Sequence, residues 1–379
     1  MIFLFFISLA ILIYIYLGYP MVVYTASLIR KGGVSKGMYQ PHVTILISAY
    51  NEEKYIGATI ENKLLLNYPR DKIEIIVISD GSDDTTDDIV RSYSERGVRL
   101  VRQEPRKGKT SALNMAVSMA HGEILVFSDA NSIYDLDALR NLMENFADPS
   151  VGYATGKMVY INPDGTAIGD GCSAYMNYEN MLRNLETRVG SIVGVDGGID
   201  AVRKFLYLNM KVDQLPDFVL PLMVVEQGYK VVYESRALLK EEALKRSDDE
   251  YRMRVRVSLR ALWVLWDMRR FLNPAHYGLF SFQLLSHKVL RYLGVVFMIG
   301  SYVFNTLILT RSRFLWIPFL LQSLFYGAAI TGYALEKKGV KLNVLYIPYY
   351  FCLINIAAGH ALIKFFRCEK RVLWEPRRG

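Results

Sequence analysis

The sequence predicts an α/β fold, a mostly parallel sheet flanked by helices, combined with apolar helices long enough to cross a membrane. Two observations support this prediction. Short apolar runs alternate with helical periods between residues 41 and 242, and uncharged apolar stretches lie on both sides of that region. In addition, 52% of the 379 residues are hydrophobic, which is a high share for a soluble protein.

The first element is the apolar segment at residues 2–28, which contains no charged residue. It is long enough for the ~30 Å hydrocarbon core of a bilayer, and basic residues begin at Arg30, which favours a cytosolic C-terminal end. A signal peptide is the alternative, but the opening Met-Ile-Phe-Leu lacks the basic start of such peptides. Residues 1–29 are therefore predicted to be a transmembrane helix.

Residues 41–242 have the composition of a soluble domain. Four apolar runs have the length of buried parallel strands: 43–48, 73–79, 98–101 and 124–127. Three helical stretches separate them: 53–66, 85–96 and 109–120. This alternation predicts repeated β-α-β units, which bind ligands at the carboxyl ends of their strands.

Residues 243–287 are predicted to form amphipathic helices at the membrane interface, because arginines alternate there with aliphatic residues and tryptophan. Residues 288–366 contain three apolar segments that read as spanning helices: 289–309, 314–335 and 344–366. The basic tail at residues 367–379 prefers the cytosol, whereas four crossings would place it outside. Either the segment around Pro348 is re-entrant or interfacial, or the charge rule fails here.

Composition also excludes some classes of function. The net charge of +8 does not indicate a nucleic-acid partner, because the basic residues gather beside apolar segments where anionic headgroups attract them. The cysteines Cys172, Cys352 and Cys368 lie far apart and have no Cys-x-x-Cys spacing. Neither a disulfide framework nor a zinc site is expected.

Polar residues gather where three predicted strands end. They read Ser-Ala-Tyr-Asn-Glu at 48–52, Ser-Asp-Gly-Ser-Asp-Asp at 79–84 and Ser-Asp-Ala-Asn at 128–131. Helix capping accounts for the acidic residues from 83 to 88. Asp80 and Asp129 differ, because each directly follows a buried strand, where a carboxylate is costly unless it is paired or binds a metal.

Asp129 and Asn131 supply two oxygen-bearing side chains at a spacing that can hold Mg²⁺ or Mn²⁺. Such an ion keeps positions for water and diphosphate oxygens, although an ordinary turn explains the same tripeptide. Residues 106–109, Arg-Lys-Gly-Lys, open the preceding helix. Their cations and the helix N-terminus could face an anion, and a solvated loop explains them equally well.

Taken together, these motifs resemble glycosyltransferase family 2, inverting enzymes with the GT-A fold, a Rossmann-like sheet flanked by helices. The resemblance runs from residue 43 to the helix near Trp263, and the membrane layout is similar to members that make polysaccharides or glycolipids. It implies that Asp80 reads the nucleotide base and that Asp129 and Asn131 hold the metal. The further nucleotide-sugar contacts that it implies are Ala49, Tyr50, Asn51, Glu52, Lys109 and Asp129.

The resemblance also implies a catalytic base, which family members take from an acidic motif ahead of a Gly-Tyr-x-Val strand. Asp217 fits this motif, Asp213 is the reserve, and a helix N-cap is the alternative for either. Residues 194–203 look like the family's glycine-rich acceptor loop, in which Asp200 is unusual. Glu179 also has a family counterpart, but no role is assigned to it.

The chain departs from the Gln-x-x-Arg-Trp motif of processive members. It has Arg256 and Arg260 one helical turn apart, where they could neutralise the donor diphosphate, followed by Trp263. All three are predicted nucleotide-sugar contacts. A purely lipid-facing role for the two arginines is the alternative. Processive synthesis is therefore in doubt.

The predicted function is inverting, metal-dependent transfer of a sugar from a nucleotide-sugar, expected to be a UDP-sugar, to a polysaccharide or lipid-linked acceptor. The reaction is placed at the cytosolic face of the bilayer, the plasma membrane if the source is prokaryotic. So few helices suggest a homo-oligomer or a partner subunit if a channel is needed. Two alternatives stay open: transfer to polyisoprenyl phosphate, and nucleotide-sugar binding without turnover.

Overall fold

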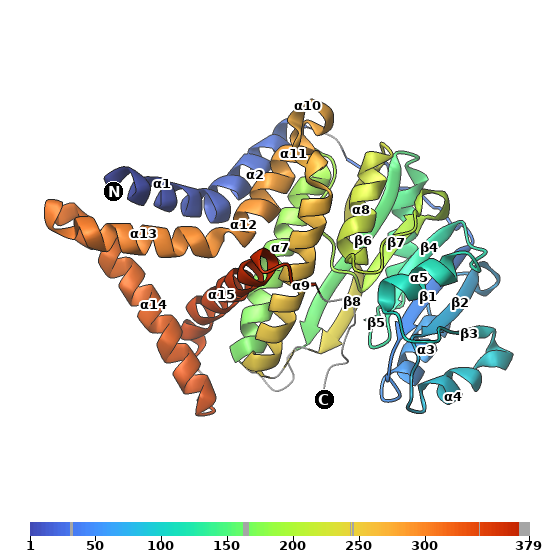
Figure 1. The fold of residues 1–379 in the computed structure, drawn as a ribbon. Helices are drawn as coiled ribbons and strands as arrows, with labels where there is room; N and C mark the ends of the chain where they lie inside the picture. The colour runs from blue at the N-terminus through green and yellow to red at the C-terminus, as the bar shows by residue number, and fades with distance from the viewer. Residues whose placement is uncertain (31–32, 162–166, 243, 245, 341, 371–379) are drawn as a thin grey trace. The chain divides into compact units, whose positions relative to one another are not determined.

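The computed structural model describes residues 1–30, 33–161, 167–242, 244, 246–340 and 342–370 (Figure 1). Most of the predicted basic tail, from residue 371 on, lies outside these residues. Contacts between residues divide the chain into two units. We call Met1–Ile29, Tyr160–Glu179 and Glu242–Lys370 the helical unit, and Arg30–Val159 with Asn180–Glu241 the sheet unit.

The sheet unit is built on an eight-stranded sheet in the order β3-β2-β1-β4-β7-β6-β8-β5. Its parallel half consists of β1 (Val43–Ala49), β2 (Ile73–Ser79), β3 (Val98–Arg102) and β4 (Ile124–Asp129). Antiparallel pairs join β7 (Ile199–Arg203) to β4 and β6 (Val151–Ile161), and β5 (Ile133–Tyr134) to β8 (Lys230–Glu242). The predicted α/β fold is confirmed, with a sheet that is mixed.

Helices flank this sheet because its strands are apolar on both faces (Figure 1). In β1 the side chains of Ile45, Leu46 and Ile47 are all fully buried. The connecting helices are α3 (Ile56–Leu64), α4 (Thr86–Arg91), α5 (Lys109–Val117), α6 (Ala138–Met143) and α8 (Pro216–Glu226). The first three are each shorter than predicted, because turns and 3₁₀ segments take up the remaining residues.

Strand register decides where the site forms. Ala49 pairs with Ser79 on β2, and Ser48 pairs with Asp129 on β4. The carboxyl ends of β1, β2 and β4 therefore meet at one edge of the sheet. Asp80 and Asp129 are thereby brought to the same edge, as parallel pairing requires.

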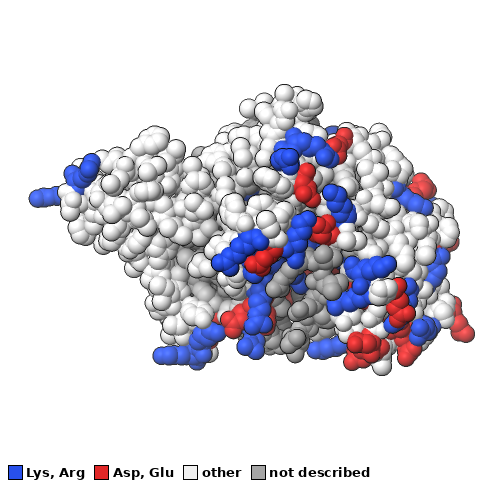
Figure 2. All heavy atoms as spheres, viewed as in Figure 1, with Lys and Arg blue, Asp and Glu red and all other residues white. Residues whose placement is uncertain are grey.

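Among its described residues, the helical unit contains four helices that are long and apolar enough to cross a membrane: Ile2–Ile29, Gly294–Arg311, Arg313–Lys337 and Tyr346–Phe366. The first comprises α1 (Ile2–Ile13) and α2 (Tyr19–Ile29), and the others contain α13 (Gly294–Ile308), α14 (Trp316–Lys337) and α15 (Tyr346–Phe366). Figure 2 shows little charge over α13 and α14 except near their ends. Leu321 and Leu324 on α14 are 63% and 73% exposed, which suits a lipid surrounding.

Aromatic and ionic contacts hold the helical unit together. On α9 (Ser247–Asp267), the ring of Trp263 lies 4.7 Å from that of Phe365 on α15. Glu179, near the middle of α7 (Ala167–Val189), is buried and pairs with His287 at 3.2 Å and with Arg291. These charges lie inside the unit and are paired there, as burial requires.

Candidate functional site

Asp80, directly after β2, holds the loop that leads into α5. Its buried carboxyl group accepts hydrogen bonds from Gln103 Nε2 at 2.5 Å and from the backbone amides of Lys107 and Gly108 at 2.9 Å each. The guanidinium of Arg106 lies 3.6 Å from the same carboxyl group. Lys109 is the first residue of α5. The hydrogen bonds to Asp80 therefore fix where α5 begins and where Lys109 lies.

Lys109 joins two carboxylates that come from distant parts of the chain. Its ammonium lies 2.7 Å from Asp129 Oδ1 at the end of β4, and 3.8 Å from Asp217 Oδ1 in the first turn of α8. Burial lowers the pKa of Lys109, but Asp129, Asp217 and Asp200 outweigh that effect and raise it above its usual value. The structure therefore brings the predicted metal ligand and the predicted base to one cation.

Asp217 is not a helix N-cap. The cap position of α8 is Leu215, and Asp217 lies inside the first turn with its carboxyl group against Gly197. Gly197 has φ +86, and a β-carbon built there would lie 2.4 Å from Asp217 Cγ. The glycine-rich segment at residues 194–203, which resembles the family's acceptor loop, thus lies directly against the carboxyl group of Asp217.

Asp200 adds a further carboxyl group beneath this site. It is the second residue of β7, is 1% exposed, and pairs across the sheet with Thr155 on β6. Burial and the nearby charge of Asp217 raise the pKa of Asp200 to about 8. Its side chain is therefore mostly neutral at pH 7.

The predicted metal ligands fit a hard divalent ion that is only partly held by protein. The side chain of Asp129 is 38% exposed, and Asn131 donates its amide nitrogen to Glu241 Oε1 at 3.4 Å, so its amide oxygen is the atom suited to a metal. Among the described residues, no three His, Cys, Asp or Glu side chains are grouped to hold a metal. Two oxygen ligands, completed by water and diphosphate, suit Mg²⁺ or Mn²⁺.

The residues after β1 are pinned to those after β2. The backbone amide of Glu52 donates to Thr86 Oγ1 at 2.8 Å, and Asn51 Nδ2 donates to Asp83 Oδ1 at 2.5 Å. The guanidinium of Arg106 stacks 3.4 Å above the ring centre of Tyr50, and the amide of Asp80 donates to the carbonyl of Ala49 at 2.9 Å. Ala49, Tyr50 and Glu52 thus lie in the same assembly as Asp80.

Three of the predicted donor contacts belong to the helical unit. Arg256, Arg260 and Trp263 all lie on α9, and their role in donor binding stays a prediction. Within that unit, Trp263 Nε1 donates to the carbonyl of Glu369 at 2.8 Å, and the ammonium of Lys370 lies 4.8 Å from the centre of its ring system.

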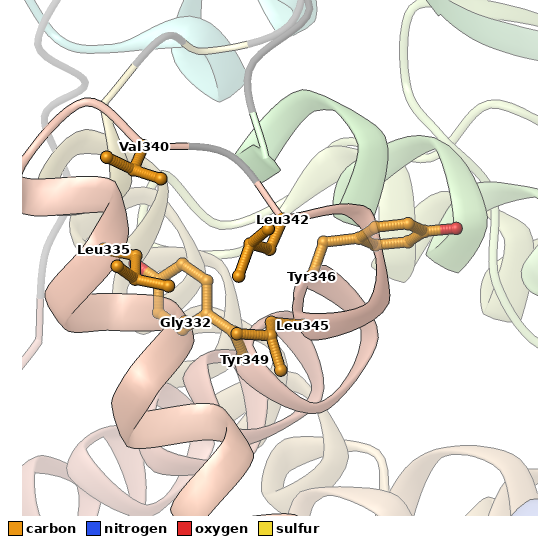
Figure 3. Close-up of a pocket in the computed structure, with 7 residues that line it drawn as sticks. All are labelled: Gly332, Leu335, Val340, Leu342, Leu345, Tyr346 and Tyr349. Atoms are coloured by element: carbon orange, nitrogen blue, oxygen red, sulfur yellow. The ribbon is translucent and has the colours of Figure 1, made fainter.

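A small pocket of the helical unit lies where α14 leads into α15 (Figure 3). Its lining is mainly apolar: Gly332, Leu335, Val340, Leu342, Leu345, Tyr346 and Tyr349. Figure 3 shows the hydroxyl of Tyr346 directed away from the other side chains. None of the predicted site residues lines this pocket.

Sequence reasoning missed two residues of the sheet unit, Lys63 on α3 and Tyr134 on β5. Lys63 is fully buried and donates to the carbonyl of Ser132 at 2.6 Å, next to Asn131. A signal was present in the sequence, because Ile56, Ile60 and Lys63 share the spacing of one buried helix face. A lysine in such an apolar stripe calls for an explanation.

Residues 44–204 match the sequence model of the family described as glycosyl transferase family 2. The poly-β-1,6-N-acetyl-D-glucosamine synthase of Staphylococcus aureus (strain COL) is 28% identical over 202 residues, which are 52% of this chain and 48% of that protein. The probable glycosyltransferase YdaM of Bacillus subtilis (strain 168) is 36% identical over 134 residues, 34% of this chain and 32% of that protein. The chain thus spans about half the length of the first relative and about a third of the second.

Among solved structures, the chain is similar to a mannosyltransferase from Pyrobaculum calidifontis in complex with GDP-Man and Mn²⁺. The likeness covers 97% of this chain and 99% of that chain, with a TM-score of 0.72 and 22% sequence identity. At that level of identity it bears on the fold alone. The predicted GT-A fold and its accompanying helices are confirmed.

Proposed function

The chain carries a glycosyltransferase family 2 domain, and from this premise we propose that it transfers a sugar from a nucleotide-sugar to a polysaccharide or lipid-linked acceptor. The observation that carries the proposal is the meeting of Asp129 and Asp217 at Lys109, at 2.7 and 3.8 Å. In this proposal one carboxylate binds a metal and the other takes a proton. Such a pair serves a reaction that releases a diphosphate and deprotonates a hydroxyl group.

Donor binding is assigned to the edge where β1, β2 and β4 end. Ala49, Tyr50, Glu52 and Asp80 seat the nucleotide, and Lys109 faces the diphosphate together with the N-terminus of α5. Support comes from the hydrogen bonds of Asp80 to the amides of Lys107 and Gly108, which set the start of that helix. An amide-rich helix start carrying a lysine favours an anion.

Chemistry is assigned to Asp217. Its carboxylate takes the proton of the acceptor hydroxyl while the oxygen attacks the anomeric carbon from the side opposite the diphosphate. The bond to the diphosphate breaks, its electrons leave with the nucleoside diphosphate, and the single displacement inverts the anomeric configuration. Mg²⁺ or Mn²⁺, bound by Asp129 and Asn131, would supply positive charge to the leaving diphosphate.

The donor is proposed to be a UDP-sugar. The staphylococcal relatives are named as polysaccharide synthases, which supports a polysaccharide product, while the archaeal structure holds GDP-Man. Both nucleotides therefore belong in a test. The four apolar helices are proposed to cross the bilayer, with the sheet unit in the cytosol, because basic residues follow the first helix from Arg30 on.

The test uses the full chain in lipid nanodiscs with Mn²⁺ or Mg²⁺. Release of nucleoside diphosphate is measured for a panel of UDP-sugars and GDP-Man, with and without glycan and lipid-linked acceptors. One donor should support release that EDTA abolishes and Mn²⁺ restores. Absence of release with every donor and acceptor would reject transfer as the function.

Asp217→Asn separates turnover from binding. The variant should lose about 10²- to 10⁴-fold in turnover, the usual contribution of a general base, and keep its donor affinity. Asp213→Asn is the matched comparison, since Asp213 is the reserve candidate four positions earlier in the chain. Full turnover in Asp217→Asn, with loss in Asp213→Asn, would move the base to Asp213.

A further inference from the structure

One face of α3 is hydrogen-bonded to the loop that carries the two candidate metal ligands. Thr59 Oγ1 donates to the carbonyl of Ala130 at 2.6 Å, and Lys63 Nζ donates to the carbonyl of Ser132 at 2.6 Å. Asn62 Nδ2 donates to the carbonyl of Tyr134 at 2.8 Å, and Asn62 Oδ1 accepts from the amide of Tyr134 at 2.8 Å. Residues 59, 62 and 63 are neighbours on the helix surface, so one helix face makes all four bonds.

These bonds fix the backbone on either side of both ligands. Ala130 directly follows Asp129, and Ser132 directly follows Asn131. Thr59 and Ser132 are fully buried, so water does not compete for these contacts. The metal loop is therefore fastened from the protein interior while the side chain of Asp129 stays partly exposed.

Lys63 is the unusual member of this set. It is fully buried, and no ion pair joins it to a carboxylate within the described residues; its partners are Ser132, Asn62 Oδ1 at 3.1 Å, and the ring of Tyr134, 3.4 Å below its nitrogen. Burial lowers the pKa of Lys63 well below its usual value. Both the ammonium and the neutral amine can donate to these oxygens, so the contact does not depend on the charge. An apolar residue would avoid the desolvation cost of burying an amine here.

Tyr134 extends the assembly to the catalytic base. Its buried hydroxyl lies 3.0 Å from the carbonyl of Phe127 and 2.8 Å from that of Gly198, to which it donates. Gly198 follows Gly197, against which the carboxyl group of Asp217 rests. A continuous set of contacts therefore runs from Lys63 through Tyr134 to the wall behind Asp217.

We propose that Lys63 is a positioning residue for the divalent metal, which it serves by holding the loop of Asp129 and Asn131 in its binding geometry. This inference rests on the proposed function in taking those two residues as ligands. Two protein ligands give a weak site unless the backbone that carries them is already ordered, because ordering it on binding would reduce the affinity. Side chains that hold metal ligands in place typically contribute about 10- to 100-fold to metal affinity.

Lys63→Met tests the proposal, because it keeps a long unbranched chain and removes the donors. The measurement is Mn²⁺ binding to the full chain with UDP present and no transfer taking place, followed by the electron paramagnetic resonance signal of free Mn²⁺. Binding should weaken about 10- to 100-fold. Lys72→Met is the matched control, since Lys72 Nζ donates to the carbonyl of Gln40 at 2.8 Å, outside the metal loop, and its Mn²⁺ affinity should be unchanged.

If the role of Lys63 were merely structural, Lys63→Met would lower the melting temperature and leave the Mn²⁺ affinity of the folded protein unchanged. That result would overturn the proposal. If Lys63→Met does not fold, Thr59→Val removes the bond to Ala130 with little change in volume and should weaken Mn²⁺ binding in the same direction. Unchanged affinity in that variant would also overturn the proposal. Failure of the wild-type chain to bind Mn²⁺ with UDP would instead reject the metal assignment of the proposed function, and this inference with it.

Discussion

The carboxyl group of Asp217 rests directly on Gly197, where a β-carbon would lie 2.4 Å from Asp217 Cγ. The two residues come from different elements, the first turn of α8 and the segment before β7. No side chain larger than hydrogen fits between them unless Asp217 moves. The glycine therefore sets the position of the proposed base.

Gly197→Ala should reduce turnover about 100-fold, because displacing a reacting group by about 1 Å has an effect of that order. Gly228→Ala is the control: Gly228 has the same φ of +86, and none of the described residues lies within 4 Å of the added carbon. Both variants should lose about 1–2 kcal/mol of stability from left-handed strain, read from their melting temperatures. Equal turnover in the two variants would show that contact with Asp217 does not matter.

Asp80→Asn should weaken donor binding about tenfold or more. The asparagine side chain can place an N–H donor against the backbone amides of Lys107 and Gly108, which now donate to the carboxylate of Asp80. Hydrogen bonds to a charged group contribute about 1.5–3 kcal/mol, so their loss should loosen the loop. Asp148→Asn is the comparison, because Asp148 likewise holds a loop, through the amides of Ser35 at 3.2 Å and Ser150 at 2.9 Å. Titration with a nucleotide-sugar should show weaker binding for the first variant alone, although both lose stability.

Lys109→Met should make the protein more responsive to metal in a thermal melt. Without the lysine, Asp129 and Asp217 lack their shared cation, so the metal-free variant should melt at a lower temperature than the wild type. Mn²⁺ supplies positive charge to the same place and no longer competes with an ammonium for Asp129. The rise in melting temperature on adding Mn²⁺ should therefore exceed that of the wild type, and an equal or smaller rise would argue against a metal at Asp129.

Asp200→Asn should change how stability depends on pH. The pKa of Asp200 is raised from 3.8 to about 8 in the folded chain, so between these values the folded chain holds a proton that the unfolded chain has lost. Stability from this group therefore falls as pH rises from about 4 to 8, and asparagine removes that fall. In EDTA, the melting temperature of the variant relative to the wild type should rise from pH 5 to pH 8 and then level off. A constant difference would contradict the raised pKa.

Much of the fold was predictable because the signals are local. The strand at Ile73–Ser79 is a continuous apolar run, and the prediction and the structure agree on both of its ends. The helix predicted at residues 53–66 is shorter, Ile56–Leu64, because residues 53–55 form a turn. Boundaries of this kind depend on hydrogen bonds to other segments, such as the bond from Glu52 to Thr86, and a local pattern does not contain them.

The sequence by itself determined which residues are proposed to carry chemistry: the acidic residues after two buried strands, the lysine that opens α5, and the acidic motif that begins α8. The tertiary structure decided how these groups meet. It placed one lysine between Asp129 and Asp217, set a glycine behind the proposed base, and put a buried lysine behind the loop of the two candidate metal ligands. The physical reason is that residue type and spacing act over a few positions, whereas these contacts join residues 20 to more than 100 positions apart through sheet order and register.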